Sequence, residues 1–316
     1  MLAEHVITQN PDNIQWGYYD AGLSPVLTVA SGDVLEIHTE PGIRTLESPI
    51  RERASENLRD IAERGKRDLG GHILTGPIAV EGVVAGDVLE VRFLDIWPRY
   101  DWGFNVIRPL AGGLPEDFPY SRTVIVEIDK EANTGDWGAG VKVPLRPYFG
   151  NFGVAPPEDF GRVPSTPPGI WGGNMDNKEF IAGSRVYLPV FQGGALFAIG
   201  DGHGCQGDGE SCLSALECGM SARVELTLRK DFSLKMPRAE TPTHHILMGF
   251  DPILDNAAKM ALRETIRFLG EVCSMSKDDA YTLCSLAVDL RITQIVNGVK
   301  GVHAMLPKSI FDEGVC

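Results

Sequence analysis

The sequence of 316 residues contains no run of about 18 uncharged apolar residues, so it predicts no transmembrane helix. Its N-terminal residues show neither the basic nor the apolar segment of a signal peptide, and we therefore expect a cytoplasmic protein. Basic residues are scarce, because 29 Lys and Arg stand against 43 Asp and Glu, a formal net charge of −14. This balance disfavours a nucleic-acid or anionic-membrane partner, since phosphate affinity depends on clustered Lys and Arg.

Cysteine is also sparse and lacks a functional spacing. The six cysteines form no C-x-x-C pair and no zinc-finger pattern. In a reducing compartment such cysteines are most simply buried small apolar side chains. We expect this of all six, namely Cys205, Cys212, Cys218, Cys273, Cys284 and Cys316.

Glycine, by contrast, is abundant at 36 residues, which together with 21 prolines predicts a turn-rich fold. The string GDVLE occurs twice, at residues 32–36 and 86–90, and each copy opens a strand-like alternation. Gly accepts positive φ and Asp can bond its own backbone, so the repeat predicts related β hairpins or a duplicated β unit. Further short strands separated by Gly and Pro favour a sandwich or barrel.

Helical spacing of apolar residues occurs in three places, residues 48–64, 255–272 and 276–290. Asp255 is the expected cap of the second helix, and Ser276 with Asp279 forms a capping box for the third. We therefore predict a mainly β (α+β) fold. A β-sandwich or barrel-like body, residues 1–240, carries a smaller C-terminal α/β portion with two helices, residues 241–316, and no independent linker separates them.

Polar residues with catalytic potential concentrate in residues 201–210, DGHGCQGDGE, which follow an apolar strand. Asp201 and His203 are two residues apart, as are Asp208 and Glu210, so either pair can face one side of an extended chain. Imidazole and carboxylate together suit Zn²⁺ or a similar metal. From the spacing alone, a flexible acidic hairpin remains an equally open interpretation.

The segment from residue 172 to 217 closely resembles the acetamidase/formamidase family. It carries GGN-x-D, GS followed by LPV, a GALF strand, then GDGHGCQGDGE and an Ala-x-Glu. The resemblance continues through HILTGPIAVEG, GDVLEVRFLDI, GNFGVAP and HAMLPK, nearly the whole chain. It implies hydrolysis of a short aliphatic amide, such as formamide or acetamide, to the acid and ammonia. It also implies a β-sandwich-like fold with a smaller α/β part and a homo-oligomer, a dimer or larger.

On this basis we assign roles as hypotheses. The metal, zinc or alternatively calcium, would be held by Asp201, His203 and His72. Glu210 would take a proton from water and pass it to the departing amine, with Asp208 as a second catalytic carboxylate or a further ligand. The substrate amide would be bound by Gln206, Asn174 and Asp176.

Structural alternatives stay open for several of these residues. His72 could simply bond a backbone carbonyl, Asn174 could tolerate a turn, and Asp176 could cap a helix. Glu217 lies just beyond the cluster and could reach it.

Two alternatives also stay open for the function. One is the same chemistry on a larger or substituted amide, whose pocket residues 48–64 could line or cover. The other is a non-catalytic β-rich module that binds calcium or a small ligand.

Overall fold

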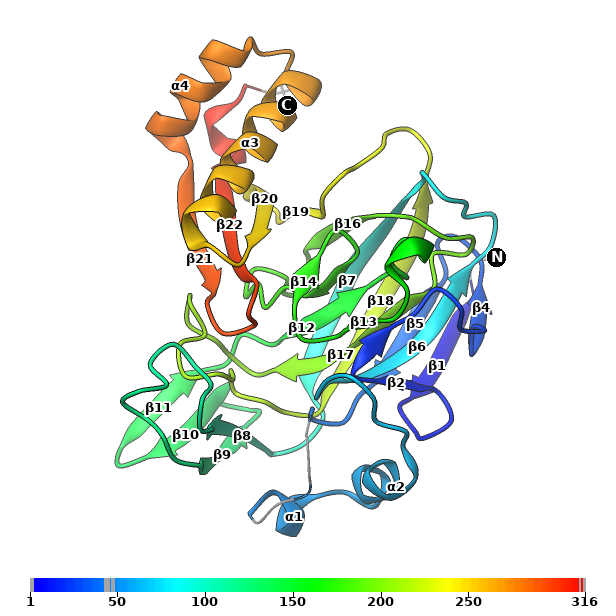
Figure 1. Ribbon diagram of the computed structural model, residues 1–316, viewed down its shortest axis with the longest axis vertical. Helices are drawn as coiled ribbons and strands as arrows, with labels where there is room; N and C mark the ends of the chain where they lie inside the picture. Colours follow the sequence, from blue (N-terminus) through cyan, green and yellow to red (C-terminus); the bar gives the residue numbers. More distant parts are fainter. Residues whose placement is uncertain (1–2, 43–45, 47–48, 313, 315–316) are drawn as a thin grey trace.

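A computed structural model describes residues 3–42, 46, 49–312 and 314 of the chain. Strands dominate it, and helices stand at its two ends, with α1 and α2 at one end and α3 and α4 at the other (Figure 1). The predicted mainly β fold, with a smaller helix-bearing C-terminal portion, is confirmed. Ser48 and Cys316, which the sequence analysis named, lie outside the described residues.

The largest sheet has nine strands and runs through the whole molecule. In spatial order they are β1 (Glu4–Thr8), β5 (Val34–His38), β18 (Met220–Arg229), β7 (Val88–Pro98), β16 (Arg185–Pro189), β19 (Arg238–Glu240), β20 (His244–Asp251), β22 (Lys300–Pro307) and β21 (Asp289–Gln294). Because β19 and β20 pair, the sheet is continuous across the predicted boundary at residue 240.

The second sheet has seven strands. They are β14 (Pro168–Gly169), β15 (Gly172–Asn174), β12 (Tyr148–Gly153), β17 (Phe197–His203), β6 (Ile73–Val80) and β2 (Ile14–Trp16), with β4 (Leu27–Val29) also paired to β6. A small two-stranded sheet joins β13 (Val163–Pro164) to β3 (Tyr18–Tyr19).

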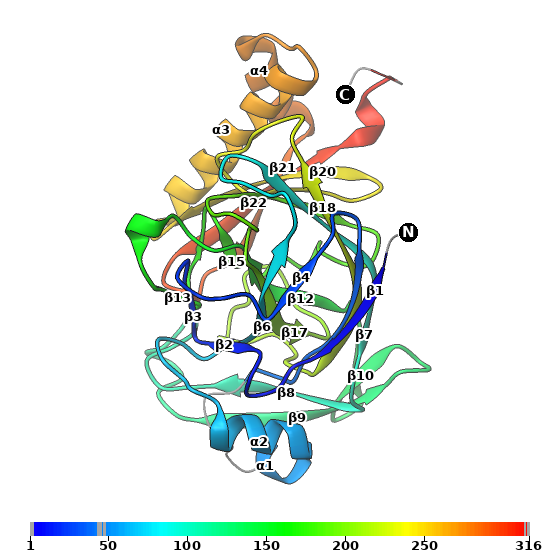
Figure 2. The ribbon, with the colours of Figure 1, turned by 90° about the vertical axis from the view of Figure 1, so that its right-hand side faces the viewer.

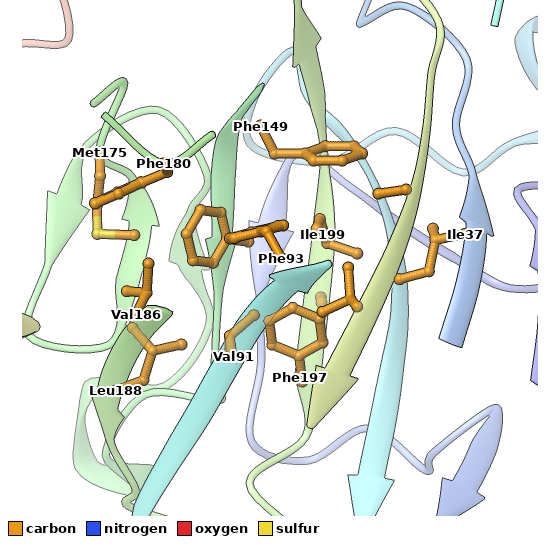
Figure 3. Close-up of a cluster of buried hydrophobic side chains, with 14 of the residues drawn as sticks. Ile37, Val91, Phe93, Phe149, Met175, Phe180, Val186, Leu188, Phe197 and Ile199 are labelled. Carbon is orange, nitrogen blue, oxygen red and sulfur yellow. The ribbon is translucent and has the colours of Figure 1, made fainter. Parts of the chain in front are cut away.

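The main core lies between these two large sheets. Figure 3 shows the aromatic rings and branched side chains of both sheets meeting there. Phe93 of β7 contacts Phe149 and Phe152 of β12, with ring centroids 6.3 and 5.2 Å apart. Burial of this apolar surface is the main force that holds the sheets together.

The GDVLE repeat forms the same turn twice. Gly32 and Gly86 have φ of +93° and +95°. Asp33 and Asp87 each accept a hydrogen bond from the backbone N–H three residues earlier, at 3.0 and 2.9 Å. Each turn, however, passes from one sheet to the other, since β4 and β6 pair in the seven-stranded sheet while β5 and β7 flank β18 in the nine-stranded sheet. The hairpin alternative is therefore wrong, and the pairing agrees with the other alternative, a duplicated β unit, which here crosses between the two sheets.

A third, four-stranded sheet meets the N-terminal helices. Its strands are β11 (Val141–Pro144), β10 (Thr134–Gly138), β9 (Arg122–Asp129) and β8 (Trp102–Ile107). Helices α1 (Ile50–Arg53) and α2 (Glu56–Arg64) lie against this sheet (Figure 2). Ile50, Leu58, Phe104 and Val106 form one buried apolar cluster between them. The predicted single helix is split because Ser55 caps α2 by accepting from the N–H of Leu58 at 2.9 Å.

The C-terminal helices are α3 (Leu254–Val272) and α4 (Lys277–Ala287), and short 3-10 turns occupy η1 (Glu158–Phe160) and η2 (Lys308–Ile310). Ser276 caps α4 as predicted, accepting from the N–H of Asp279 at 3.1 Å. The predicted Asp255 cap is wrong, because Asp255 lies inside the first turn and Ile253 precedes the helix. The side of α3 that carries Ala257 is buried because it packs closely against β20. The backbones are so near each other there that a Cβ on Gly249 would stand 2.2 Å from the carbonyl oxygen of Ala257.

The cysteines divide into different environments. Cys218 and Cys284 are buried, as expected, and Cys205 is half-buried. Cys212 is exposed and Cys273 is disulfide-bonded, so the prediction is wrong for these two. In the described part of the chain no helix is long and apolar enough to cross a membrane.

Candidate active site

The site is built on two paired strands of the seven-stranded sheet, β12 and β17. Their register sets Tyr148 opposite His203 and Asn151 opposite Gly200. Between them on β12 lies Gly150, where a Cβ would stand 2.4 Å from Oδ1 of Asp176 and 2.6 Å from Cε1 of His203. The absence of a side chain at Gly150 therefore lets these polar groups converge.

Two groups of potential metal ligands share His203. One comprises Asp176, His203 and Glu210, and the other Asp201, His203 and Glu217; within each group the ligand atoms lie within 4.8 Å of one another. Nε2 of His203 is 3.5 Å from Oδ2 of Asp201 and 3.3 Å from Oε1 of Glu217. Tetrahedral ligands at about 2.1 Å from a zinc ion stand roughly 3.4 Å apart, so both distances from Nε2 of His203 suit one ion.

The orientation of the His203 ring follows from a chain of hydrogen bonds. Nε2 of Gln206 donates to the backbone oxygen of Asp176 at 2.8 Å, which leaves its Oε1 to accept from the hydroxyl of Tyr148. Because Tyr148 has only one proton, its oxygen accepts from Nδ1 of His203, at 2.8 Å. Nε2 thus faces Asp201 and Glu217, which is the arrangement that orients a metal-bound histidine.

Four carboxyl groups are buried around one imidazole, and the pKa of each carboxyl group is shifted from its ordinary value. Burial raises the pKa of Glu210 and Asp176, and it raises that of Glu217 to about 7. Burial would also raise the pKa of Asp201, but His72 and His203 hold it well below its ordinary value.

The pKa of the His203 imidazole is also shifted, and the direction is set by its charged neighbours. Burial by itself would lower the pKa of His203, but Tyr148, Glu217 and Asp201 raise it well above its ordinary value. Such an excess of buried negative charge favours a bound cation.

Several polar atoms at the site have no partner among the described residues. They are Oδ1 of Asn174, Oδ1 of Asp176, Nε2 of His203 and Oε2 of Glu210, all buried. Unpaired buried polar atoms are costly and mark places where a ligand completes the structure. Together with the donor set, they show that these residues can hold a divalent cation.

The backbone is strained at the same place. Asp176, Asp201 and Glu210 have φ of +48°, +62° and +45°, in the left-handed region that non-glycine residues rarely occupy. Residues held in this way are typical of functional sites.

A cavity of about 610 Å³ opens above these groups. Asn174, Asp176, Asp201, Glu210 and Glu217 line one part of it. The site therefore combines a floor of titratable carboxyl groups with space for an organic ligand.

Comparison with known proteins identifies this arrangement. A model of the acetamidase/formamidase family matches residues 10–164 and 162–313. The chain belongs to the acetamidase/formamidase family.

Curated relatives in this family include an acetamidase of Mycolicibacterium smegmatis, 30% identical over 47% of this chain and 51% of the relative. A formamidase of Methylophilus methylotrophus is 28% identical over 60% of this chain and 61% of its own length. The aligned regions thus span between half and two thirds of these relatives.

Solved structures agree over almost the whole chain. An acetamidase of Bacillus halodurans superposes with a TM-score of 0.84 and 29% identity, covering 96% of this chain and 98% of the other. A predicted acetamidase/formamidase of Thermoanaerobacter tengcongensis gives a TM-score of 0.87 and 27% identity, covering 98% and 97%.

Within this family frame, the structure brings most of the predicted site residues together. Asp201, Glu210, Asn174 and Asp176 line the cavity, and His203 lies buried beside them. His72 also lines the cavity, with Nε2 3.8 Å from Oδ2 of Asp201 and Nδ1 2.8 Å from Oγ of Ser165.

Besides the buried His203, two predicted residues lie outside the cavity wall. Asp208 pairs with Nζ of Lys178 at 2.9 Å. The side chain of Gln206 is fully engaged with protein groups, since it also donates to the backbone oxygen of Thr293 at 3.3 Å.

The structure adds residues that the sequence analysis did not assign. Asn297, from the loop after β21, donates to Oδ2 of Asp176 at 2.5 Å and to the backbone oxygen of Asn174 at 3.3 Å. Its Asn-Gly dipeptide signals a turn, but nothing local signals contact with Asp176. Glu217, which had been left open, bridges to His203 in strand register.

Proposed function

We propose that this protein is an amidase that hydrolyses a primary amide of the formamide or acetamide type to a carboxylate and ammonia, assisted by a divalent cation. The observation that supports it best is the geometry around His203. In a chain of the acetamidase/formamidase family, Nε2 of His203 faces Asp201 and Glu217 on one side of a cavity where Glu210 and Asn174 present unpaired oxygens.

The cation would be held by Asp201, His203 and Glu217. A mixed imidazole and carboxylate set suits zinc better than calcium, which prefers six to eight oxygens. When bound, the cation would supply a Lewis acid that polarises the amide carbonyl and activates water. Tyr148 fixes the imidazole for this task through Nδ1.

Glu210 is the proposed general base and acid. Its Oε2 is buried and unpaired among the described residues, and Glu210 lines the cavity, so this carboxylate can take a proton from the attacking water. The same carboxyl then returns the proton to the departing nitrogen, because an amide anion is too poor a leaving group to depart unprotonated. The raised pKa of Glu210 favours this second step.

The substrate NH₂ group has two acceptors within reach of the cavity. Oδ1 of Asn174 and Oδ1 of Asp176 are both unpaired and can each accept one amide N–H. Asn297 holds Asp176 in place for this contact. We assign Gln206 to support of the Asp176 backbone and Asp208 to its ion pair with Lys178. A cytoplasmic homo-oligomer remains our prediction.

The decisive test compares two carboxylates of the same loop. Glu210→Gln should lower kcat for ammonia release from acetamide 100-fold or more, because general acid–base catalysis contributes about 10²–10⁴. Asp208→Asn, the matched control, should keep kcat within a few-fold. Equal activity of Glu210→Gln and wild type, with both folded, would remove Glu210 from the mechanism.

Metal dependence is tested on the same protein. Exhaustive chelation should abolish ammonia release, and zinc should restore it. Stabilisation by calcium without turnover of any amide would instead support a binding module.

A further inference from the structure

The cavity is much larger than the smallest amides require. Acetamide has four heavy atoms and occupies roughly 100 Å³, about three times the volume share of a water molecule. The cavity measures about 610 Å³. Most of the space would therefore be left to water if acetamide were the only substrate.

The cavity wall is chemically divided. Beside the carboxylates it is lined by Phe104 and Val106 of β8, Thr123 of β9 and Ile50 of α1, and the N–H of Phe104 donates to the backbone oxygen of Glu217 at 2.8 Å. Val106 and Thr123 are register partners, so they stand side by side on the same face of the sheet. Phe104, Val106 and Ile50 also belong to one packed apolar cluster, which gives this wall a rigid backing.

Two further apolar residues extend this wall toward the catalytic groups. Leu213 follows Glu210 by three residues, and its backbone N–H donates to the carbonyl oxygen of Glu210 at 3.2 Å. Val296 immediately precedes Asn297, the partner of Asp176. An apolar group attached to the amide carbon would therefore find apolar surface from the reacting atoms outward.

We propose that the site, besides hydrolysing amides of the formamide and acetamide type, prefers an uncharged primary amide whose acyl group is apolar and larger than acetyl, a branched aliphatic chain or an aromatic ring. The carboxamide lies on the carboxylate floor and the acyl group lies against the wall formed by Ile50, Phe104, Val106 and Thr123. This inference rests on the proposed amidase function. Arg67 and Arg108 also line the cavity, but both are engaged in other interactions, so an acyl chain ending in a carboxylate is the weaker alternative.

The first experiment measures kcat/KM of the metal-loaded wild type for formamide, acetamide, butyramide, isobutyramide, benzamide and succinamate. Each buried methylene should raise kcat/KM about fourfold, so butyramide should exceed acetamide by an order of magnitude. Turnover of acetamide without such a gain, or a preference for succinamate, would overturn this inference and leave the amidase function standing. If no amide is hydrolysed, the proposed function fails and the inference with it.

The second experiment fills the acyl space. Thr123 is half-buried, and Thr123→Phe should lower the ratio of kcat/KM for benzamide to that for acetamide tenfold or more. Thr28→Phe makes the same change at an exposed position of β4 and should leave this ratio unaltered. An unaltered ratio in Thr123→Phe would contradict the assignment of the wall. Should that variant not fold, the substrate series of the wild type still decides the question.

Discussion

At the scale of single residues, the site depends on the absence of a side chain at Gly150 as much as on the polar side chains around it. Gly150 leaves the space into which Asp176, His203 and Asp201 project. A motif such as GNFG in the sequence signals a tight turn or a close approach, yet it does not say what approaches. The carboxylates and the imidazole supply the chemistry, and the glycine makes their convergence sterically feasible.

Gly150→Ala should therefore damage the site selectively. Its Cβ would overlap Oδ1 of Asp176 at 2.4 Å, so we expect activity to fall at least tenfold and the free energy of unfolding to drop by about 1–3 kcal/mol. Amide turnover and urea denaturation measure the two effects. Gly207→Ala is the matched control within the catalytic loop, because a Cβ there meets nothing within 4 Å, and it should change neither.

At the scale of elements, α1 contributes Ile50 to the acyl wall, and the start of the adjoining α2 is anchored by a single buried carboxylate. Glu40 is completely buried and accepts from Oγ of Ser55 at 3.0 Å and Nδ2 of Asn57 at 2.8 Å. It also accepts from Nη1 of Arg99 and the hydroxyl of Tyr100, at 3.0 and 2.8 Å. The helices are thus tied to the nine-stranded sheet by charge-assisted hydrogen bonds as well as by apolar packing.

Glu40→Gln should loosen this attachment. The amide replaces an acceptor by a donor that faces other donors, and removal of one partner of a buried ion pair costs about 3–5 kcal/mol. Urea denaturation should show this loss, and hydrogen exchange should accelerate most in α2 (Glu56–Arg64). Glu56→Gln, exposed on the same helix, should leave both unchanged; a similar effect of the two substitutions would contradict the anchor.

At the scale of the whole molecule, the C-terminal portion completes the site. The nine-stranded sheet continues into it, and its loop after β21 brings Asn297 to Asp176. Thr293 supports the catalytic loop by accepting from the N–H of Gly209 at 3.1 Å, and its hydroxyl bonds Nδ1 of His303 at 2.7 Å. The site therefore requires both portions of the chain.

His303 should make this integrated fold sensitive to acid. It is fully buried, and burial lowers the pKa of His303 to about 4. The unfolded chain binds a proton below about pH 6.5, so stability falls as the pH is lowered from 6.5 toward 4. Between pH 7.5 and 5.0 this histidine should account for a loss of about 2 kcal/mol.

The variant His303→Asn tests this assignment, because its amide can keep the contact with Thr293 but does not titrate. Denaturant unfolding at the two pH values should show a loss smaller by about 2 kcal/mol than in the wild type. Equal losses in the two proteins would assign the acid sensitivity to other groups.

The sequence by itself determined the strand-rich fold, the capped helix α4, the two identical Gly-Asp turns and the concentration of chemistry in residues 201–210. These depend on local periodicity, backbone freedom and short-range hydrogen bonds, which a sequence records directly. Only the tertiary structure decided that each Gly-Asp turn crosses between sheets, that Asp208 pairs with Lys178, that Asn297 reaches Asp176, and that Glu217 reaches His203. Those outcomes depend on strand register and on contacts between residues distant in the sequence, as between Asn297 and Asp176, which are 121 positions apart. No local pattern encodes such a contact, because its energy is gained only when the two sheets and the C-terminal portion pack together.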